Sequence, residues 1–136
     1  MPKQTKGRIL CTEDDADARD LLAFILGQEG YEVVCTENPE DALKLARSEN
    51  FDLFLVDSWM PGMSGTQLTE KLREFNIKTP ILFYTAAAYQ KDKDDAREAG
   101  AQGYLVKPVE NDYLIAEVVK LIAEAKIAYP LEIIVP

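Results

Sequence analysis

Histidine is absent from this chain of 136 residues, and cysteine is scarce. Without an imidazole the chain can build no histidine-based catalytic triad, no histidine metal site and no phosphohistidine relay of its own. The two cysteines, Cys11 and Cys35, are too few for the disulfide framework of a small secreted domain. Both lie in apolar, strand-like runs, so we expect small buried thiols in a reducing compartment.

Long apolar runs and an excess of basic charge are also lacking. No run approaches the roughly 20 apolar residues that a membrane-spanning helix needs, and the polar, basic residues 1–7 do not resemble a signal peptide. Lysine plus arginine total 15 against 24 aspartates and glutamates, a net charge of −9. Because nucleic-acid affinity depends on a cationic surface, we expect a cytoplasmic protein that contacts neither membrane nor nucleic acid directly.

Short apolar runs alternate with amphipathic segments along the whole chain. The runs predict strands near residues 9–12, 31–36, 51–57, 80–85 and 103–106. Helices are expected over 15–28, from Pro39 onward, around 68–75, over 90–100 and over 110–126, with Leu21 and Phe75 among their buried side chains. Five strand–helix pairs predict an α/β fold, a doubly wound five-stranded parallel sheet with helices on both faces.

Polar residues stand where the predicted strands end. Glu13 and Asp14 follow the first strand, Asp57 and Thr85 end the third and fourth, and Lys107 follows the fifth. In such a sheet ligands bind beyond the carboxyl ends of the strands. Clustered carboxylates favour a hard cation such as Mg²⁺, and an ammonium with a hydroxyl suits a phosphoryl group. The residues therefore predict a magnesium site beside an acceptor carboxylate.

Four segments in this order resemble the receiver (response regulator) domain of two-component signalling: ILCTEDDADARDLL, LVDSWMPGMSG, ILFYTAA and GYLVKP. The resemblance runs from about residue 8 to 126. It implies a flavodoxin-like (βα)5 fold with strand order 2-1-3-4-5. We expect a receiver domain at 8–127, a flexible extension at 1–7, and an apolar tail at 128–136 that docks as a strand, binds a partner or begins a linker.

The resemblance also implies a role for each site residue. Asp57 corresponds to the phosphoacceptor, and Lys107 to the lysine that pairs with the acceptor and then with the phosphoryl oxygens. The Mg²⁺ ligands would be Glu13, Asp14, Asp57 and the backbone carbonyl of Trp59. The remaining assignments are the switch hydroxyl Thr85, the switch aromatic Tyr104, and a cis peptide bond before Pro108.

The implied activity is signalling rather than enzymatic turnover. A histidine kinase, a phosphotransfer protein or a small phosphodonor would phosphorylate Asp57, and the change at Thr85 and Tyr104 would expose a face to a downstream protein. Homodimerisation is compatible with this face. Tyr89 and Tyr113 are candidates to join it, although an ordinary half-buried aromatic is the favoured interpretation of each. The resemblance implies that Trp59 and Ala87 occupy positions that tune dephosphorylation. Neither side chain can activate water, so we expect slow autodephosphorylation.

Other interpretations stay open at this point. We favour a stand-alone receiver that acts by binding a protein, and the alternative is a receiver fragment of a longer regulator whose output domain is missing. The complete set of site residues disfavours a receiver that has become a scaffold without phosphorylation. A Mg²⁺-dependent phosphatase with an aspartyl-phosphate intermediate would need an acid two residues after Asp57, where Trp59 stands. A flavin or nucleotide carrier would need a phosphate-cradling loop, which the acids after the first strand disfavour.

Overall fold

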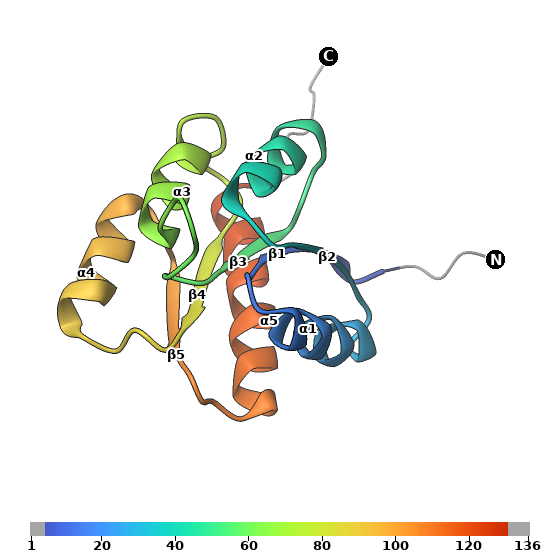
Figure 1. Ribbon diagram of the computed structural model, residues 1–136. Coiled ribbons are helices and arrows are strands. Elements are labelled where there is room, and N and C mark those ends of the chain that lie inside the picture. Colours follow the sequence, from blue (N-terminus) through green and yellow to red (C-terminus); the bar gives the residue numbers. More distant parts are fainter. Residues whose placement is uncertain (1–4, 131–136) are drawn as a thin grey trace, which may run out of the picture.

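The computed structural model describes residues 5–130, and within them five strands form one parallel sheet (Figure 1). The strands are β1 (Gly7–Thr12), β2 (Tyr31–Thr36), β3 (Leu53–Val56), β4 (Ile81–Thr85) and β5 (Gly103–Val106). Their order across the sheet is β2-β1-β3-β4-β5, and every neighbouring pair is parallel. The predicted fold class and strand order are thus confirmed.

Helices cover both faces of the sheet. They are α1 (Ala16–Gln28), α2 (Pro39–Ser48), α3 (Gly65–Arg73), α4 (Gln90–Ala99) and α5 (Asn111–Ala128). Helices α1 and α5 pack on one face, and α2, α3 and α4 pack on the other (Figure 1). Successive side chains of β1 alternate between the two cores, with Ile9 and Cys11 in one and Leu10 in the other. Covered on both faces, strand β3 is fully apolar and buried.

Polar caps fix where three of the helices begin. The side chain of Asp15 accepts a hydrogen bond from the Ala18 backbone N–H at 2.8 Å and starts α1. Asn38 caps α2, with Pro39 at the first helical position, and Ser64 opens α3 in a capping box with Gln67. Each cap satisfies backbone donors at a helix N-terminus. The loops at the carboxyl edge of the sheet therefore end at defined points.

Three side chains differ from the sequence-based expectation. Leu21 is 58% exposed, because it lies at the edge of the buried stripe of α1. Phe75 lies beyond the end of α3, is partly exposed, and has the guanidinium of Arg47 5.0 Å from its ring centroid. Cys11 is buried, but Cys35 is only half-buried because β2 is an edge strand.

The boundaries of the fold lie close to the expected ones. Strand β1 begins at Gly7, and the backbone N–H of Lys6 donates to the carbonyl of Gly30, so the extension expected at 1–7 overlaps the sheet. Helix α5 ends at Ala128. Most of the tail expected at 128–136 lies outside the described residues. Among residues 5–130, no helix combines the length and apolar character needed to cross a membrane.

Candidate functional site

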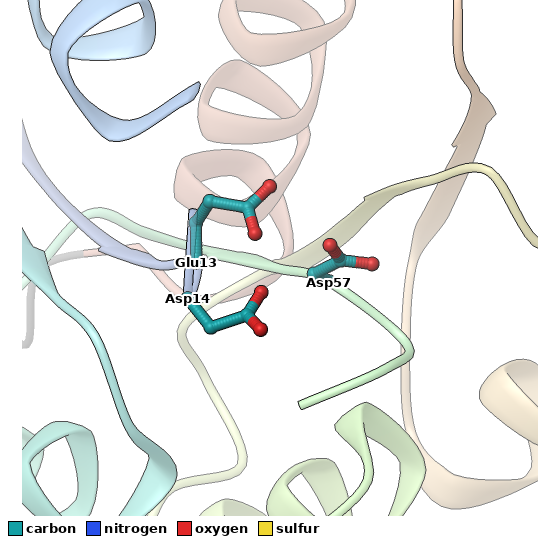
Figure 2. Close-up of side chains that lie close together, drawn as sticks. All are labelled: Glu13, Asp14 and Asp57. Atoms are coloured by element: carbon teal, nitrogen blue, oxygen red, sulfur yellow. The ribbon is translucent and has the colours of Figure 1, made fainter. Parts of the chain in front are cut away.

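Three carboxylates meet at the carboxyl edge of the sheet. Glu13 and Asp14 follow β1 and Asp57 follows β3, and one oxygen from each lies within 4.8 Å of the others. In Figure 2 the carboxyl groups of Glu13 and Asp14 extend toward the side on which Asp57 lies. Glu13 is buried at 3% exposure, Asp57 is half-buried and Asp14 is exposed. The structure thus brings together the acids that the sequence placed at separate strand ends.

The backbone holds this acidic loop in place. The Glu13 N–H donates to the carbonyl of Thr36, and the Asp57 N–H donates to that of Thr12, so the sheet pairing continues past the strand ends. From α1, Nη1 of Arg19 donates to the carbonyls of both Glu13 (2.8 Å) and Asp14 (3.0 Å). Sequence reasoning missed Arg19, because a side chain that binds backbone carbonyls leaves no pattern in residue types.

Gly65 is a second residue that sequence reasoning did not assign to the site. A Cβ atom at this position would lie 2.3 Å from the carbonyl oxygen of Asp57 and 3.0 Å from the Phe83 ring. The Gly65 N–H also donates to the carbonyl of Ser58 at 3.0 Å, which closes the loop after β3. Only glycine fits this close approach. The signal was present in the sequence as the glycine that ends LVDSWMPGMSG.

Lys107 completes the charged cluster from β5. Its Nζ lies 2.7 Å from Oε1 of Glu13 and 3.7 Å from Oδ2 of Asp57, and it is 5.1 Å from the Tyr84 ring centroid. The Lys107 backbone N–H donates to the carbonyl of Thr85, and the Lys107–Pro108 peptide bond is cis. The ammonium therefore contacts the carboxylate of Glu13 and lies near that of Asp57.

Burial and neighbouring charges shift the pKa values of this ion pair. Burial raises the pKa of Glu13, and the nearby charge of Asp57 adds to the increase, while the hydrogen bond from Lys107 opposes it. Burial alone would lower the pKa of Lys107, but the hydrogen bond to Glu13 and the charges of Glu13 and Asp57 outweigh burial and raise it. The ammonium is thus firmly protonated. Three clustered carboxyl groups, two of them beside the Lys107 ammonium, carry more negative charge than this one ammonium balances, and such a cluster favours a cation.

The loop after β4 connects the two expected switch residues. Thr85 is fully buried, and its Oγ1 accepts a hydrogen bond from the Ala87 N–H at 3.2 Å. The hydroxyl of Tyr104 donates to the carbonyl of Ala87 at 2.8 Å, and its ring stacks on Phe83 with centroids 5.5 Å apart. Ala87 therefore joins the switch pair through its backbone. Tyr104 is already held against this loop, rather than lying free in solvent.

The backbone of Trp59 lies beside the carboxylate of Asp57. Its N–H is 3.4 Å from Oδ1 of Asp57, while its indole is 61% exposed. The backbone N–H at this position thus borders the acidic cluster. Its side chain adds no acid or amide to the site.

Comparison with known proteins assigns this arrangement to a family. The model of the response regulator receiver domain matches residues 9–119. The chain belongs to this family. Receiver domains of this family are signalling modules of two-component systems, and the fold found here is theirs. The prediction made from the four sequence segments is therefore confirmed.

Individual relatives share about a third of the residues of this receiver domain. The transcriptional regulatory protein DltR of Streptococcus agalactiae is 32% identical over 111 residues, which are 82% of this chain and 50% of DltR. The alkaline phosphatase synthesis transcriptional regulatory protein PhoP of Bacillus subtilis is 32% identical over 123 residues, 90% of this chain and 51% of PhoP. This chain spans about half the length of the curated relatives it matches.

Two solved receiver domains superpose over most of the chain. A CheY-like receiver domain protein from Methanospirillum hungatei JF-1 is 30% identical, with a TM-score of 0.87, covering 92% of this chain and 99% of its own. The receiver domain of the sensor histidine kinase PA1611 from Pseudomonas aeruginosa is 27% identical, with a TM-score of 0.80, covering 86% and 98%. The PA1611 structure contains a magnesium ion coordinated in the active-site cleft.

Proposed function

We propose that this receiver domain accepts a phosphoryl group on Asp57 in a Mg²⁺-dependent transfer. The donor would be the phosphohistidine of a histidine kinase or phosphotransfer protein, or a small phosphodonor. The observation that carries the proposal is the position of Lys107, whose Nζ lies 3.7 Å from Asp57 and 2.7 Å from Glu13. A carboxylate that lies beside an ammonium and two further acids is equipped to receive an anion together with a cation.

The residues present fit a magnesium ion. Ligand oxygens at about 2.1 Å from Mg²⁺ lie roughly 3 to 4 Å from one another in an octahedron. Oxygens of Glu13, Asp14 and Asp57 lie within 4.8 Å of each other, so a small closure would bring them onto one ion. The carbonyl of Trp59 would be the further protein ligand. When bound, the ion would neutralise charge on the phosphoryl oxygens. The magnesium in the PA1611 receiver domain supports this assignment.

Asp57 and Lys107 would carry out the transfer. An Asp57 oxygen forms the new bond to phosphorus in line with the leaving group, and the breaking P–N bond leaves its electron pair on the donor imidazole. Lys107 would shift from Glu13 toward the phosphoryl oxygens, because these carry more charge than a shared carboxylate. Asp57 is half-buried and so remains open to a donor protein.

The signal would leave through the loop that holds Thr85 and Tyr104. A phosphoryl group on Asp57 would attract the Thr85 hydroxyl, which now accepts from the Ala87 N–H. That exchange would move Ala87 and the tyrosine bound to its carbonyl. Tyr89 and Tyr113 are 80% and 60% exposed at the starts of α4 and α5, not half-buried as an ordinary aromatic would be. They would contribute to a face for a downstream protein partner or a second copy of the chain.

The proposed unit comprises residues 8–127, and its output depends on what it contacts. Because this chain spans about half of its curated relatives, a receiver segment of a longer regulator fits the comparisons as well as a separate receiver does. In both cases Asp57 would receive the phosphoryl group, and the surface that contains Tyr104, Tyr89 and Tyr113 would contact the partner.

Intact-mass measurement after incubation with acetyl phosphate and Mg²⁺ tests the proposal. We expect one added phosphoryl group on the wild type, none after chelation of Mg²⁺, and none on Asp57→Asn. Asp20→Asn, which removes an exposed carboxylate of α1, is the matched control and should be phosphorylated like the wild type. An adduct on Asp57→Asn, or a wild type that accepts no phosphoryl group from acetyl phosphate or phosphorylated kinases, would overturn the assignment.

A further inference from the structure

The two cysteines of the chain face each other across neighbouring strands. Cys11 in β1 and Cys35 in β2 are register partners, and both point toward the core beneath α1 and α5. Adjacent strands lie about 4.8 Å apart, and disulfides join residues whose Cα atoms are about 4.4 to 6.8 Å apart. The register therefore places this pair in the range where a bridge forms without moving either strand far.

The pair is accessible to small molecules from the side of β2, and β2 is also the strand that can adjust its position. Cys11 is buried, but Cys35 is half-buried and borders a surface hollow of about 560 Å³ that Arg19, Glu37 and Lys44 also line. Strand β2 is at the edge of the sheet and has β1 as its neighbour on one side. A small oxidant can therefore reach Cys35 first, and β2 can adjust to a bridge without disturbing another strand.

The surroundings of Cys35 favour its thiolate. A hydrogen bond from the Cys11 thiol lowers the pKa of Cys35 to about 7, burial opposes this effect, and the positive charge of Arg19 supports it. When protonated, the Cys35 thiol donates a long hydrogen bond of 3.9 Å to the carbonyl of Arg19 in α1, and this contact opposes ionisation. Because the thiolate is the form that attacks an oxidant, Cys35 is the nucleophile of the pair and Cys11 is its resolving partner.

We propose that Cys11 and Cys35 form an oxidation site that closes to an intramolecular disulfide when it meets a hydroperoxide. The Cys35 thiolate attacks one peroxide oxygen, the O–O bond breaks, and the leaving hydroxide takes a proton to become water. The Cys11 sulfur then attacks the sulfenic sulfur of Cys35, the S–O bond breaks, and a second water leaves with the thiol proton. Two thiols and one hydrogen peroxide thus become one disulfide and two waters.

The bridge would lie directly beneath the acidic cluster. The residue after Cys35 is Thr36, whose carbonyl accepts from the Glu13 N–H at 3.1 Å, and whose hydroxyl is 3.2 Å from that of Thr12. Joining β1 to β2 at Cys11 and Cys35 would therefore restrain the strand ends that support Glu13. This site goes beyond the proposed phosphoryl transfer and does not depend on it.

Peptide mapping of the peroxide-treated protein tests the proposal. Trypsin cleavage after Arg8, Arg19 and Lys44 leaves Cys11 in residues 9–19 and Cys35 in residues 20–44. After brief exposure to hydrogen peroxide we expect the monomer to lose two hydrogen masses, and these two peptides to appear as one species that dithiothreitol separates. Before oxidation, iodoacetamide should label Cys35 at least about tenfold faster than Cys11.

Single variants separate this outcome from simpler oxidation. Cys11→Ser should leave Cys35 to gain oxygen atoms or to trap an added thiol, while Cys35→Ser should leave Cys11 unmodified. Wild-type protein in which Cys35 gains oxygen while Cys11 stays a free thiol, or in which the only disulfides join two chains, would overturn the proposal. Phosphorylation of Asp57 is measured on the reduced protein, so failure there and failure here are distinguishable.

Discussion

Glu13 is the buried member of the carboxylate cluster, and its ionisation costs the fold free energy. Since burial and the charge of Asp57 raise its pKa, the stability linked to protonated Glu13 is fully present below the ordinary carboxyl pKa. That stability is lost as the pH rises through the raised pKa. Near pH 7 without a cation the native state therefore carries an unfavourable charge. Such a cost is expected where residues are arranged for binding rather than for stability.

Replacing this carboxylate by an amide should stabilise the protein without metal. Glu13→Gln keeps an acceptor for the Lys107 ammonium and removes the repulsion with Asp57. We expect the free energy of unfolding to rise by about 1 kcal/mol at pH 7 in chelator, a few degrees in Tm. The gain should shrink toward pH 4, where the wild-type carboxyl is protonated. Urea titrations would show this, with exposed Glu124→Gln changing stability by less than about 0.5 kcal/mol. An equal or lower stability of Glu13→Gln at pH 7 would contradict the argument.

We expect Trp59 to affect a different property, the lifetime of the proposed phosphoaspartate. Its indole is exposed and offers no acceptor to a water molecule near Asp57. Trp59→Asn places an amide at this position, and we expect dephosphorylation to become roughly tenfold faster, a lowering of the barrier by about 1.4 kcal/mol. Decay of the phosphorylated mass after removal of the phosphodonor measures the rate. Trp59→Phe should decay like the wild type, and a Trp59→Asn rate equal to or below that of wild type would refute this role.

Some site residues could be predicted from the sequence and others could not, and the difference depends on the kind of contact that each makes. Glu13, Asp57 and Lys107 each end or follow a strand, so the parallel sheet alone brings their side chains to one edge. Arg19 and Gly65 act through backbone carbonyls of the same loops. Such contacts depend on the path of the loop. Residue types do not record this path for Arg19, whereas for Gly65 the glycine itself was a signal in the sequence. The roles of the predicted residues in phosphoryl transfer stay predictions until they are measured.

At the scale of elements, α4 is the helix with the weakest attachment to the core. Ala96 is its buried side chain, whereas α5 buries four: Leu114, Val118, Leu121 and Ile122. Arg73, at the end of α3, holds the far end of α4 instead. Its Nε and Nη2 donate to the carbonyl of Gly100 at 3.1 and 2.9 Å, and Nη2 also donates to Gln102. The anchoring of α4 is therefore polar and local, which suits an element that shifts on signalling.

Removing this anchor should loosen α4 selectively. Arg73→Ala leaves the Gly100 carbonyl without its guanidinium donors, and we expect a loss of about 1 to 3 kcal/mol in the free energy of unfolding. Amide hydrogen exchange should accelerate in α4 and not in α5. Arg97→Ala is the matched control, because Arg97 is exposed and its contact to Asp94 is 3.9 Å long, and it should cost less than about 0.5 kcal/mol. Uniform acceleration across both helices would argue against a local anchor.

The elements themselves were predictable because their patterns are strong. Strand bounds at β2 and β5 agree with the expected ranges, and β3 and β4 are shorter at their ends. The predicted burial of Leu21 and Phe75 was wrong for a physical reason. Leu21 lies at the margin of the apolar stripe of α1, and Phe75 lies just past the end of α3. Periodicity alone does not separate a buried edge position from an exposed one. The partner that covers Phe75, the Arg47 guanidinium, comes from another helix.

At the scale of the whole molecule, we expect the acidic edge to couple folding to cation binding. A chain of net charge −9 with three carboxylates held together gains stability from any cation that binds the native state and not the unfolded chain. We expect Mg²⁺ at 100 times its Kd to raise the free energy of unfolding by about 2.7 kcal/mol. Sodium at equal ionic strength screens charge without occupying a site, so it should have a much smaller effect.

Two variants, Asp14→Asn and Glu13→Gln, test whether these carboxylates are responsible for the coupling. Asp14→Asn should fold as well as the wild type, because Asp14 is exposed, yet lose most of the Mg²⁺-dependent gain. Glu13→Gln should be the more stable protein in chelator and the less stable one in saturating Mg²⁺, so its curve crosses that of the wild type as Mg²⁺ is titrated. Thermal unfolding across a magnesium series would reveal the crossing. Parallel curves for all three proteins would mean that Mg²⁺ acts elsewhere on the surface and that these carboxylates are not its ligands.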